Sequence, residues 1–242
     1  MRALLSVDAV SKRFHGLVAV DRLSFEVPEG GIFAVIGPNG AGKTTLFNMI
    51  AGEFPPDNGS ISFAAERIDG LPPDRICRRG IGRTFKIVRP FPGLSVEDNV
   101  IVGALLHRHH VTDARARAHE VLRRLDLYDK RLQRASALTL PDRKRLEVAR
   151  ALATDPKLLL LDEVMAGLRP TETDRIVAIL QELNRETGLT ILLIEHVMRA
   201  VMALASRILV LHHGAAIAQG TPEQVVRDRA VIDSYLGADV IA

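Results

Sequence analysis

The sequence lacks the features of secreted, membrane-spanning and repetitive proteins. Its single cysteine, Cys77, excludes a disulfide within the chain and fits a reducing cytosol. No apolar run approaches the ~18–20 residues needed to span a bilayer, and the N-terminus has no signal-peptide pattern. No internal repeat or low-complexity segment is visible. We therefore expect a cytosolic chain without a membrane span of its own.

The composition is that of one compact body. Of the 242 residues, 47% are hydrophobic, which is enough to bury one sizeable core, or one core with a small subdomain. The net charge is +3, and the excess of Arg and Lys is concentrated between Arg108 and Arg150. Such a basic stretch suits nucleic acid or an anionic surface, although a solvated helical face is the commoner explanation.

A glycine-rich segment carries most of the chemical information, and its sequence is Gly37-Pro38-Asn39-Gly40-Ala41-Gly42-Lys43-Thr44-Thr45. It follows the apolar run Ile32–Ile36 and precedes Leu46–Ile50, which reads as the opening of a helix. The pattern G-x-x-x-x-G-K-[ST] between a strand and a helix is typical of a phosphate-binding loop. This context argues against a chance glycine turn.

The residue types in this loop suit phosphate chemistry. Gly37, Gly40 and Gly42 allow positive φ and let the backbone approach an anion without a Cβ in the way. The amides of the loop and the N-terminus of the helix then point at the phosphates. Lys43 can reach the β- and γ-phosphates, and the Thr44 hydroxyl suits Mg²⁺. The loop therefore predicts binding of a nucleoside triphosphate.

A second chemical element is the apolar run Leu158–Leu161, which ends in Asp162 and Glu163. A strand that ends in carboxylates places them at the carboxyl edge of the sheet, where ligands bind in α/β folds. Asp162 would hold the hydrated Mg²⁺, and Glu163 would orient or deprotonate the attacking water. The alternative is a strand followed by an ordinary polar turn. The phosphate loop upstream favours the catalytic interpretation.

The order of predicted elements indicates an α/β fold. Continuous Leu and Ile runs suit strands that are buried on both faces of a mainly parallel sheet. Helical spacing prevails between Ser95 and about Ala153, where Ser95 and Asp98 form a capping box. We expect one domain over residues 1–242, with a helical subdomain inserted at about residues 95–153. The other expected strands are Leu4–Val10, Phe25–Val27, Ser60–Phe63, Ile81–Phe85, Thr190–Ile194 and Ile208–Leu211. The other expected helices are Val197–Leu204 and a helix from Thr171, capped by Asp174, to Thr187, with Gly188 as its stop.

Together these motifs resemble the ATP-binding cassette (ABC) family of transporter ATPases nearly end to end. Arg145–Leu152 resembles the helix that follows the signature loop of the family, and Ile194-Glu195-His196 resembles its switch histidine after a strand. Phe14 lies where the family stacks an aromatic ring on adenine. The alternatives are a core position for Phe14 and an ordinary strand-end histidine for His196.

A finer resemblance is to the ATPase subunits of bacterial importers of branched-chain or other hydrophobic amino acids. Three segments carry it, namely Gly82-Arg83-Thr84-Phe85, Ala166-Gly167-Leu168-Arg169-Pro170-Thr171-Glu172 and Ser234-Tyr235-Leu236-Gly237. The family resemblance implies a P-loop NTPase core with a mainly parallel sheet, an N-terminal antiparallel β part and a helical subdomain. It also implies ATP and Mg²⁺ as cofactors and a peripheral place on the cytoplasmic face of the inner membrane.

The resemblance further implies partners. Two cassettes of the family close head-to-tail over two ATP molecules, and each site is completed by the signature loop of the other cassette. The chain would dock on separate permease subunits, for which the groove near Phe85–Gly93 and the basic helical subdomain are our candidate surfaces. A periplasmic or extracellular substrate-binding protein would take part indirectly. No nucleic-acid partner is expected.

Three positions depart from the family pattern. Lys86 stands where a Gln usually contacts Mg²⁺ and water, and Arg169 replaces a carboxylate or amide that crosses the dimer interface. The signature segment is Leu138-Thr139-Leu140-Pro141-Asp142 instead of Leu-Ser-Gly-Gly-Gln. Pro141 has no N–H to offer a phosphate. These departures predict a heterodimer in which this chain's own phosphate loop does most of the hydrolysis, with a homodimer as the alternative.

Three rival functions stay open from the sequence. One is an ABC ATPase for another cargo, such as urea or exported lipopolysaccharide. The second is a nucleic-acid-linked ATPase, which the basic stretch favours and the short helical insert opposes. The third is a regulatory cassette that binds ATP without turning it over. Lys86 and Pro141 favour it, whereas Asp162, Glu163 and His196 oppose it.

Overall fold

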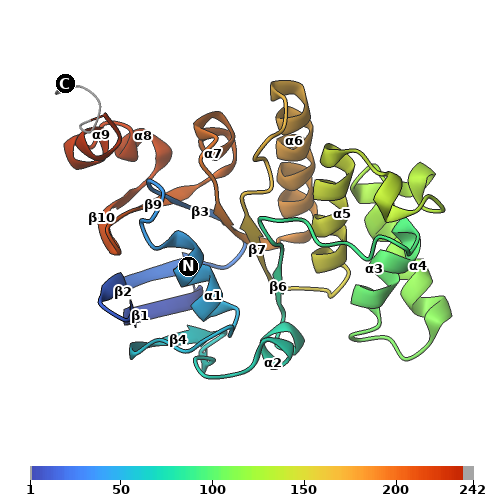
Figure 1. Cartoon of the computed structure of the whole chain (residues 1–242), viewed down its shortest axis with the longest axis horizontal. Coiled ribbons are helices and arrows are strands. Elements are labelled where there is room, and N and C mark those ends of the chain that lie inside the picture. The colour runs from blue at the N-terminus through green and yellow to red at the C-terminus, as the bar shows by residue number, and fades with distance from the viewer. Residues whose placement is uncertain (1, 237–242) are drawn as a thin grey trace.

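The frame of the chain consists of two β-sheets of different kinds (Figure 1). The structure is a computed structural model that describes residues 2–236. In the larger sheet the strand order is β10-β9-β3-β8-β7-β6, and all neighbours are parallel except β10, which runs antiparallel to β9. Its strands are β3 (Ile32–Ile36), β6 (Ile81–Arg83), β7 (Leu158–Asp162), β8 (Thr190–Ile194), β9 (Arg207–His212) and β10 (Ala215–Gly220).

The smaller sheet is antiparallel and is built mainly from the N-terminal segment, as expected. Its order is β2-β1-β4-β5. The strands are β1 (Ala3–Phe14), β2 (Leu17–Pro28), β4 (Asn58–Phe63) and β5 (Glu66–Arg67). β1 and β2 are each longer than the sequence pattern predicts, because exposed polar residues interrupt their apolar alternation.

Both faces of the parallel strands are buried, and the side chains alternate between two cores. In β3, Ile32, Ala34 and Ile36 belong to one core, whereas Phe33 and Val35 belong to the other. The second core fills the space between the two sheets and contains Leu46, Phe47 and Ile50 of helix α1 (Lys43–Ile50). Alternation with period two explains why continuous apolar runs form these strands.

Of the other helices, α2 contributes Ile76 to the second core and the rest pack on the first, with α3 and α4 at one end of the molecule and α8 and α9 at the opposite end (Figure 1). They are α2 (Pro73–Arg78), α3 (Val96–Ala104), α4 (Val111–Arg124), α5 (Leu140–Leu152), α6 (Pro170–Thr187), α7 (Met198–Leu204), α8 (Pro222–Val225) and α9 (Arg229–Leu236), with 3₁₀ turns at Tyr128–Lys130 and Ala135–Ala137. Helices α3 to α5 occupy the region that we expect to be the helical subdomain. That subdomain boundary, at about residues 95–153, stays a prediction.

Most predicted boundaries lie within a few residues of the structure. The cap of α3 is confirmed, because Ser95 Oγ accepts a hydrogen bond from the Asp98 N–H at 3.0 Å. The predicted cap of α6 is wrong. This helix begins at Pro170, and the Glu172 carboxylate accepts the Arg169 N–H at 2.9 Å, while Asp174 bonds Arg199 instead. Gly188 ends α6 with φ +66°, as predicted.

Within residues 2–236, no helix combines the length and the apolar character that crossing a bilayer requires. Of the segment Ser234–Gly237, which contributes to the finer resemblance, Gly237 lies outside the described residues.

Candidate functional site

One cleft of about 320 Å³ brings most of the predicted site residues together. It lies at the carboxyl end of β3, where the phosphate loop leads into α1. Its lining contains Phe14 from the end of β1, Lys86, Glu163 and the loop residues Asn39 to Thr45. It also contains Leu17, Val18 and Ala19, which sequence reasoning missed and which the β1–β2 hairpin places beside Phe14. The cleft gathers segments that are far apart in the sequence.

Two glycines of the loop are required by close backbone contacts. A Cβ at Gly37 would lie 2.2 Å from the Leu211 carbonyl oxygen, and a Cβ at Gly42 would lie 2.3 Å from that of Ala19. Gly40 has open space around it, but its φ of +81° is one that side chains disfavour. The predicted positive φ is therefore confirmed at all of these glycines.

Lys43 is the first residue of α1 and is 7% exposed. Its Nζ donates hydrogen bonds to the carbonyl oxygens of Gly37, at 2.7 Å, and Pro38, at 2.9 Å. Burial lowers the pKa of Lys43, while the charge of Glu163 acts in the opposite direction. The ammonium group is thus held inside the loop, where a phosphate would lie.

Lys86, Glu163 and His196 meet at the edge of the cleft. Lys86 Nζ lies 2.9 Å from Glu163 Oε2, and His196 Nδ1 lies 3.8 Å from the same oxygen. The Glu163 side chain is buried, whereas those of Lys86 and His196 are more than half exposed. The hydrogen bond to Glu163 raises the pKa of Lys86. Lys86 therefore pairs with the predicted general base, a contact that the sequence does not reveal.

Asp162 ends β7 and is 1% exposed. Burial raises its pKa, and the nearby guanidinium of Arg83, 3.7 Å from Asp162 Oδ2, opposes that rise. Asp162 Oδ1 is buried and has no hydrogen-bond partner among the described residues. A buried acceptor without a partner is a suitable ligand for a cation or for its bound water.

Phe14 lies on the wall of the cleft and is 41% exposed. Its ring meets the ring of Phe54 edge-on, with 5.3 Å between centroids, and Lys12 Nζ lies 5.8 Å from the Phe14 centroid. Phe54 fixes one edge of the Phe14 ring, while a large part of Phe14 faces solvent. This arrangement excludes a simple core position for Phe14.

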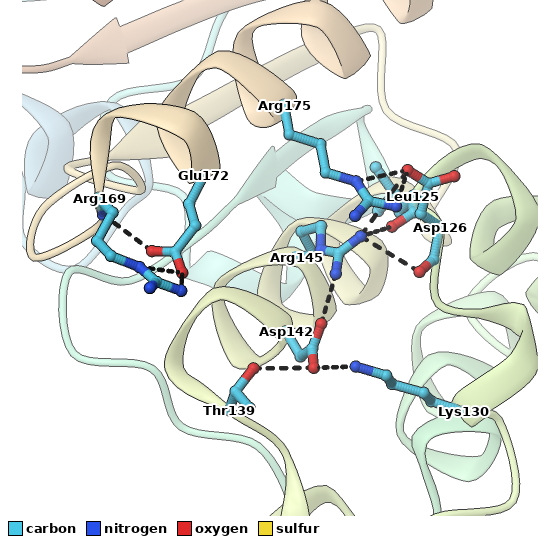
Figure 2. Close-up of polar contacts among 9 residues, drawn as sticks. All are labelled: Leu125, Asp126, Lys130, Thr139, Asp142, Arg145, Arg169, Glu172 and Arg175. Atoms are coloured by element: carbon cyan, nitrogen blue, oxygen red, sulfur yellow. Dashed lines mark hydrogen bonds and ion pairs between the residues drawn. The ribbon is translucent and has the colours of Figure 1, made fainter.

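The predicted signature segment is helical rather than a loop at its second half, because Leu140, Pro141 and Asp142 form the first turn of α5. Asp142 is 2% exposed, and Lys130, Arg145 and the Thr139 hydroxyl donate hydrogen bonds to it (Figure 2). Burial opposes ionisation of Asp142, but these donors outweigh it and lower its pKa. The carboxylate is thus neutralised within the chain.

Ion pairs extend from Asp142 to neighbouring elements (Figure 2). Arg145 also donates to the carbonyl oxygens of Leu125 and Asp126, both at 3.2 Å, beyond the C-terminal end of α4. Arg175 of α6 lies 2.9 Å from the Asp126 carboxylate. Arg169 is separate from this network and pairs with Glu172 at 2.7 Å. Arg145 therefore joins α5 to the end of α4, and Asp126 joins that end to α6.

Two buried charged residues near the site were missed by sequence reasoning. Lys144 and Glu195 are 4% and 1% exposed. Lys144 Nζ donates to the carbonyl oxygens of Lys86, at 3.1 Å, and Glu163, at 3.0 Å. Glu195 Oε1 accepts the Met165 N–H at 2.9 Å. The position of Glu195 next to His196 was the only sequence signal for either residue.

Comparison with known proteins agrees with this geometry. Residues 20–166 match the family described as ABC transporter, and residues 217–241 match the family described as branched-chain amino acid ATP-binding cassette transporter. In the solved structure of the ADP conformation of MJ1267, an ATP-binding cassette of an ABC transporter, the fold is similar with a TM-score of 0.89 and 29% identity. That similarity covers 98% of this chain and 100% of the other.

Curated relatives are similar over nearly their whole length. The high-affinity branched-chain amino acid transport ATP-binding protein LivG of Salmonella typhimurium is 40% identical, over 97% of this chain and 98% of that protein. BraF of Pseudomonas aeruginosa, of the same description, is 39% identical over 98% of each. The lipopolysaccharide export system ATP-binding protein LptB of Escherichia coli is 36% identical over 98% of each.

Replacement of Lys43 is the direct test of the loop. Lys43→Ala is expected to abolish tight binding of Mg-ATP, because it removes the cation from a loop built around an anion. Calorimetric titration of the full chain measures the affinity. Lys157→Ala, which changes an exposed lysine outside the cleft, is the matched control. Equal affinity in Lys43→Ala and the parent would exclude the loop as the binding site.

The raised pKa of Glu195 predicts that the free energy of unfolding depends on pH. Burial raises its pKa from 4.5 to about 7, although the amides of Met165 and His196 oppose this rise. The folded chain therefore binds more protons at this site than the unfolded chain between these two pH values. The contribution of Glu195 to the free energy of unfolding therefore falls as the pH rises between these two values, and it is constant at higher pH.

Glu195→Gln removes this titration. Between pH 5 and pH 8 the parent is expected to lose up to about 3 kcal/mol more unfolding free energy than the variant. Urea unfolding at both pH values measures the difference, with Glu26→Gln at an exposed position of β2 as the control. Identical pH dependence in Glu195→Gln and the parent would contradict the raised pKa.

Proposed function

This chain belongs to the ABC transporter family of ATP-binding proteins, and on that premise we propose that it hydrolyses ATP to power an importer of branched-chain or other hydrophobic amino acids. One observation carries the catalytic part, namely that the phosphate loop, Lys86 and Glu163 line one cleft. The match of residues 217–241 and the similarity to LivG and BraF support the cargo class.

In this proposal the amides of the phosphate loop and Lys43 hold the triphosphate. Glu163 orients or deprotonates the attacking water, and His196 donates a hydrogen bond to the γ-phosphate. Lys86 already pairs with Glu163, so an entering γ-phosphate offers this half-exposed ammonium a second anionic partner. Glu163 without Lys86 would repel the phosphate. An ammonium group that contacts both anions offsets this repulsion.

The nucleotide base is expected to stack on Phe14. The ring is exposed on one side and is fixed on the other by Phe54. Stacking of a base on an aromatic side chain contributes about 1–3 kcal/mol in nucleic-acid complexes. This is enough to favour a nucleotide over bare phosphate in the cleft.

We propose Mg²⁺ as the metal, with the Thr44 hydroxyl and Asp162 as the residues that hold it or its bound water. Residues 2–236 contain no group of three or more His, Cys, Asp or Glu side chains that could hold a metal ion by itself. Mg²⁺ fits such a site, because it keeps several waters and takes phosphate oxygens as ligands beside one or two carboxylates. The unpartnered Asp162 Oδ1 supports this assignment. When bound, the ion would neutralise phosphate charge.

For assembly we propose a head-to-tail pair of cassettes, in which the Leu138–Asp142 segment and Arg169 face the nucleotide of the other subunit. Asp142 is neutralised within the chain, so the first turn of α5 keeps its affinity for an anion despite this carboxylate. Pro141 still lacks one N–H. The pair is therefore proposed to be a heterodimer in which this chain's own phosphate loop does most of the hydrolysis, and a homodimer is the alternative.

Exposed apolar side chains near Phe85–Gly93 are the proposed docking surface for the permease. Phe85, Ile87, Phe91 and Leu94 are each at least 40% exposed, with Ile87 at 69%. Contiguous exposed apolar side chains often mark an interaction site. This docking would place the chain on the cytoplasmic face of the cell membrane, with a substrate-binding protein on the opposite side as an indirect partner.

Replacement of Glu163 is the experiment that tests the catalytic assignment. Glu163→Gln is expected to slow hydrolysis by at least ~10²-fold, the scale of losing a positioned base, while ATP still binds. ATPase assays of the assembled transporter and nucleotide titration measure the two effects. Glu26→Gln is the control, and His196→Ala distinguishes a switch from a strand-end histidine. Hydrolysis at the parental rate in Glu163→Gln would remove this residue from the mechanism.

The cargo class is tested by uptake. Cells without this gene are expected to lose high-affinity uptake of labelled leucine, isoleucine or valine, and a plasmid carrying the parent chain restores it. The same plasmid with Glu163→Gln does not restore it, because the transporter is then unpowered. Glycerol uptake is the control. Unchanged uptake of all these amino acids, with loss of another cargo such as urea, would contradict the proposal.

A further inference from the structure

Glu163 has a backbone conformation that its residue type disfavours. Its φ is +50°, in the left-handed region, although it carries a Cβ. Such a conformation is unfavourable for residues other than glycine, and it persists only where the surrounding structure holds it. The backbone of Glu163 determines where its carboxylate points. The contacts that hold this turn therefore bear on the position of the proposed base.

Hydrogen bonds hold the turn from three sides. The Glu163 N–H donates to the Ile194 carbonyl oxygen at the end of β8, at 2.9 Å. Lys144 Nζ donates to the Glu163 carbonyl oxygen at 3.0 Å. Two residues further on, the Met165 N–H donates to Glu195 Oε1 at 2.9 Å. The first contact is a backbone contact between neighbouring strands, but the other two are supplied by buried charged side chains.

Lys144 also links the turn to Lys86. Its second hydrogen bond goes to the Lys86 carbonyl oxygen at 3.1 Å. The two carbonyl groups that Lys144 binds thus belong to the two residues whose side chains pair at 2.9 Å in the cleft. Lys144 holds the backbones of Lys86 and Glu163 at a fixed separation. It does this from α5, without entering the cleft itself.

Burial of an ammonium group is costly unless the group is well bonded. Lys144 is 4% exposed, and burial lowers its pKa, while the charges of Glu195 and Glu163 act in the opposite direction. In residues 2–236 no carboxylate oxygen lies within 4.0 Å of its Nζ, so its direct partners are backbone carbonyls. A lysine that served only to fill this space would be replaced at little cost by an apolar residue of the same length.

We propose that Lys144 is a positioning residue for ATP hydrolysis, which aims the Glu163 carboxylate and keeps Lys86 beside it, with Glu195 as the second anchor of the turn. This inference rests on the proposed function, in which Glu163 acts on the attacking water. Lys144 does not touch the nucleotide. Its removal is therefore expected to affect turnover and not nucleotide affinity.

The test is Lys144→Met, which keeps the length of the side chain and removes both hydrogen bonds. A misplacement of about 1 Å at a reacting group can lower the rate ~10²-fold. We therefore expect kcat of the assembled transporter to fall ~10- to 10²-fold, because the Glu163 turn relaxes. The ATP affinity of the full chain should stay within about threefold of the parent, since the phosphate loop is unchanged. Lys144→Arg, which can still donate to both carbonyls, should recover part of the rate.

Three further measurements separate positioning from general damage. Lys144→Met combined with Glu163→Gln should be no slower than Glu163→Gln alone, because the turn has no base left to aim. Hydrogen exchange at the Met165 amide should be faster in Lys144→Met than in the parent, whether or not the chain hydrolyses ATP. Arg185→Met, at an exposed position near the end of α6, is the control and should change neither rate. If Lys144→Met does not fold, Lys144→Gln, which is too short to reach both carbonyls, takes its place.

The results for Glu163→Gln and Lys144→Met show separately whether the proposed function of Glu163 or only the positioning role of Lys144 fails. If Glu163→Gln keeps the parental rate, the proposed function of Glu163 fails and the positioning role fails with it. If Glu163→Gln is slow but Lys144→Met has nearly the parental kcat, only the positioning role is overturned. Loss of ATP affinity in a folded Lys144→Met chain, or a double variant much slower than Glu163→Gln, would also overturn it.

Discussion

Burial of both faces of the parallel strands β3, β8 and β7 is the constraint on which the site depends. Their side chains alternate between two apolar cores, so charged groups collect where the strands end. Because the strands are parallel, their carboxyl ends lie at one edge of the sheet. At this edge the phosphate loop follows β3, Asp162 ends β7 and Glu163 follows it, and Glu195 with His196 follows β8. The pairing of the strands thus assembles the site from three distant segments.

Concentration of charge at this edge makes mutual neutralisation necessary. Asp162 and Glu195 are each about 1% exposed, and Lys43, Lys144 and Glu163 are also buried. Each of these groups has an opposite charge nearby or hydrogen bonds with the backbone, but two buried oxygens, Asp162 Oδ1 and Glu195 Oε2, have no hydrogen-bond partner among the described residues. Of these two oxygens, Asp162 Oδ1 belongs to the residue that we propose as a holder of the metal or its bound water.

The signature segment shows how a departure from the family pattern is accommodated. An aspartate in the first turn of a helix that approaches a phosphate would repel it, yet Asp142 is turned into the chain and bonded by Lys130 and Arg145 (Figure 2). The same arginine extends to the end of α4, where Asp126 pairs with Arg175 of α6. Asp142 thus belongs to a network, continued by Arg145 and Asp126, that joins α5, the end of α4 and α6.

The sequence by itself determined the fold class and the family, and it predicts the main site residues, because these depend on local patterns. The spacing of Gly37, Gly42 and Lys43 between a strand and a helix specifies a phosphate loop, and the apolar run before Asp162 specifies a buried strand that ends at the site. Only the tertiary structure decided that Lys86 pairs with Glu163, that Asp142 faces inward, and that Lys144 and Glu195 hold the Glu163 turn. Each of these contacts, except that of Asp142 with Arg145, joins residues from different segments, and none leaves a periodic or composition signal. The direction of a charged side chain depends on which partner the rest of the fold brings within reach.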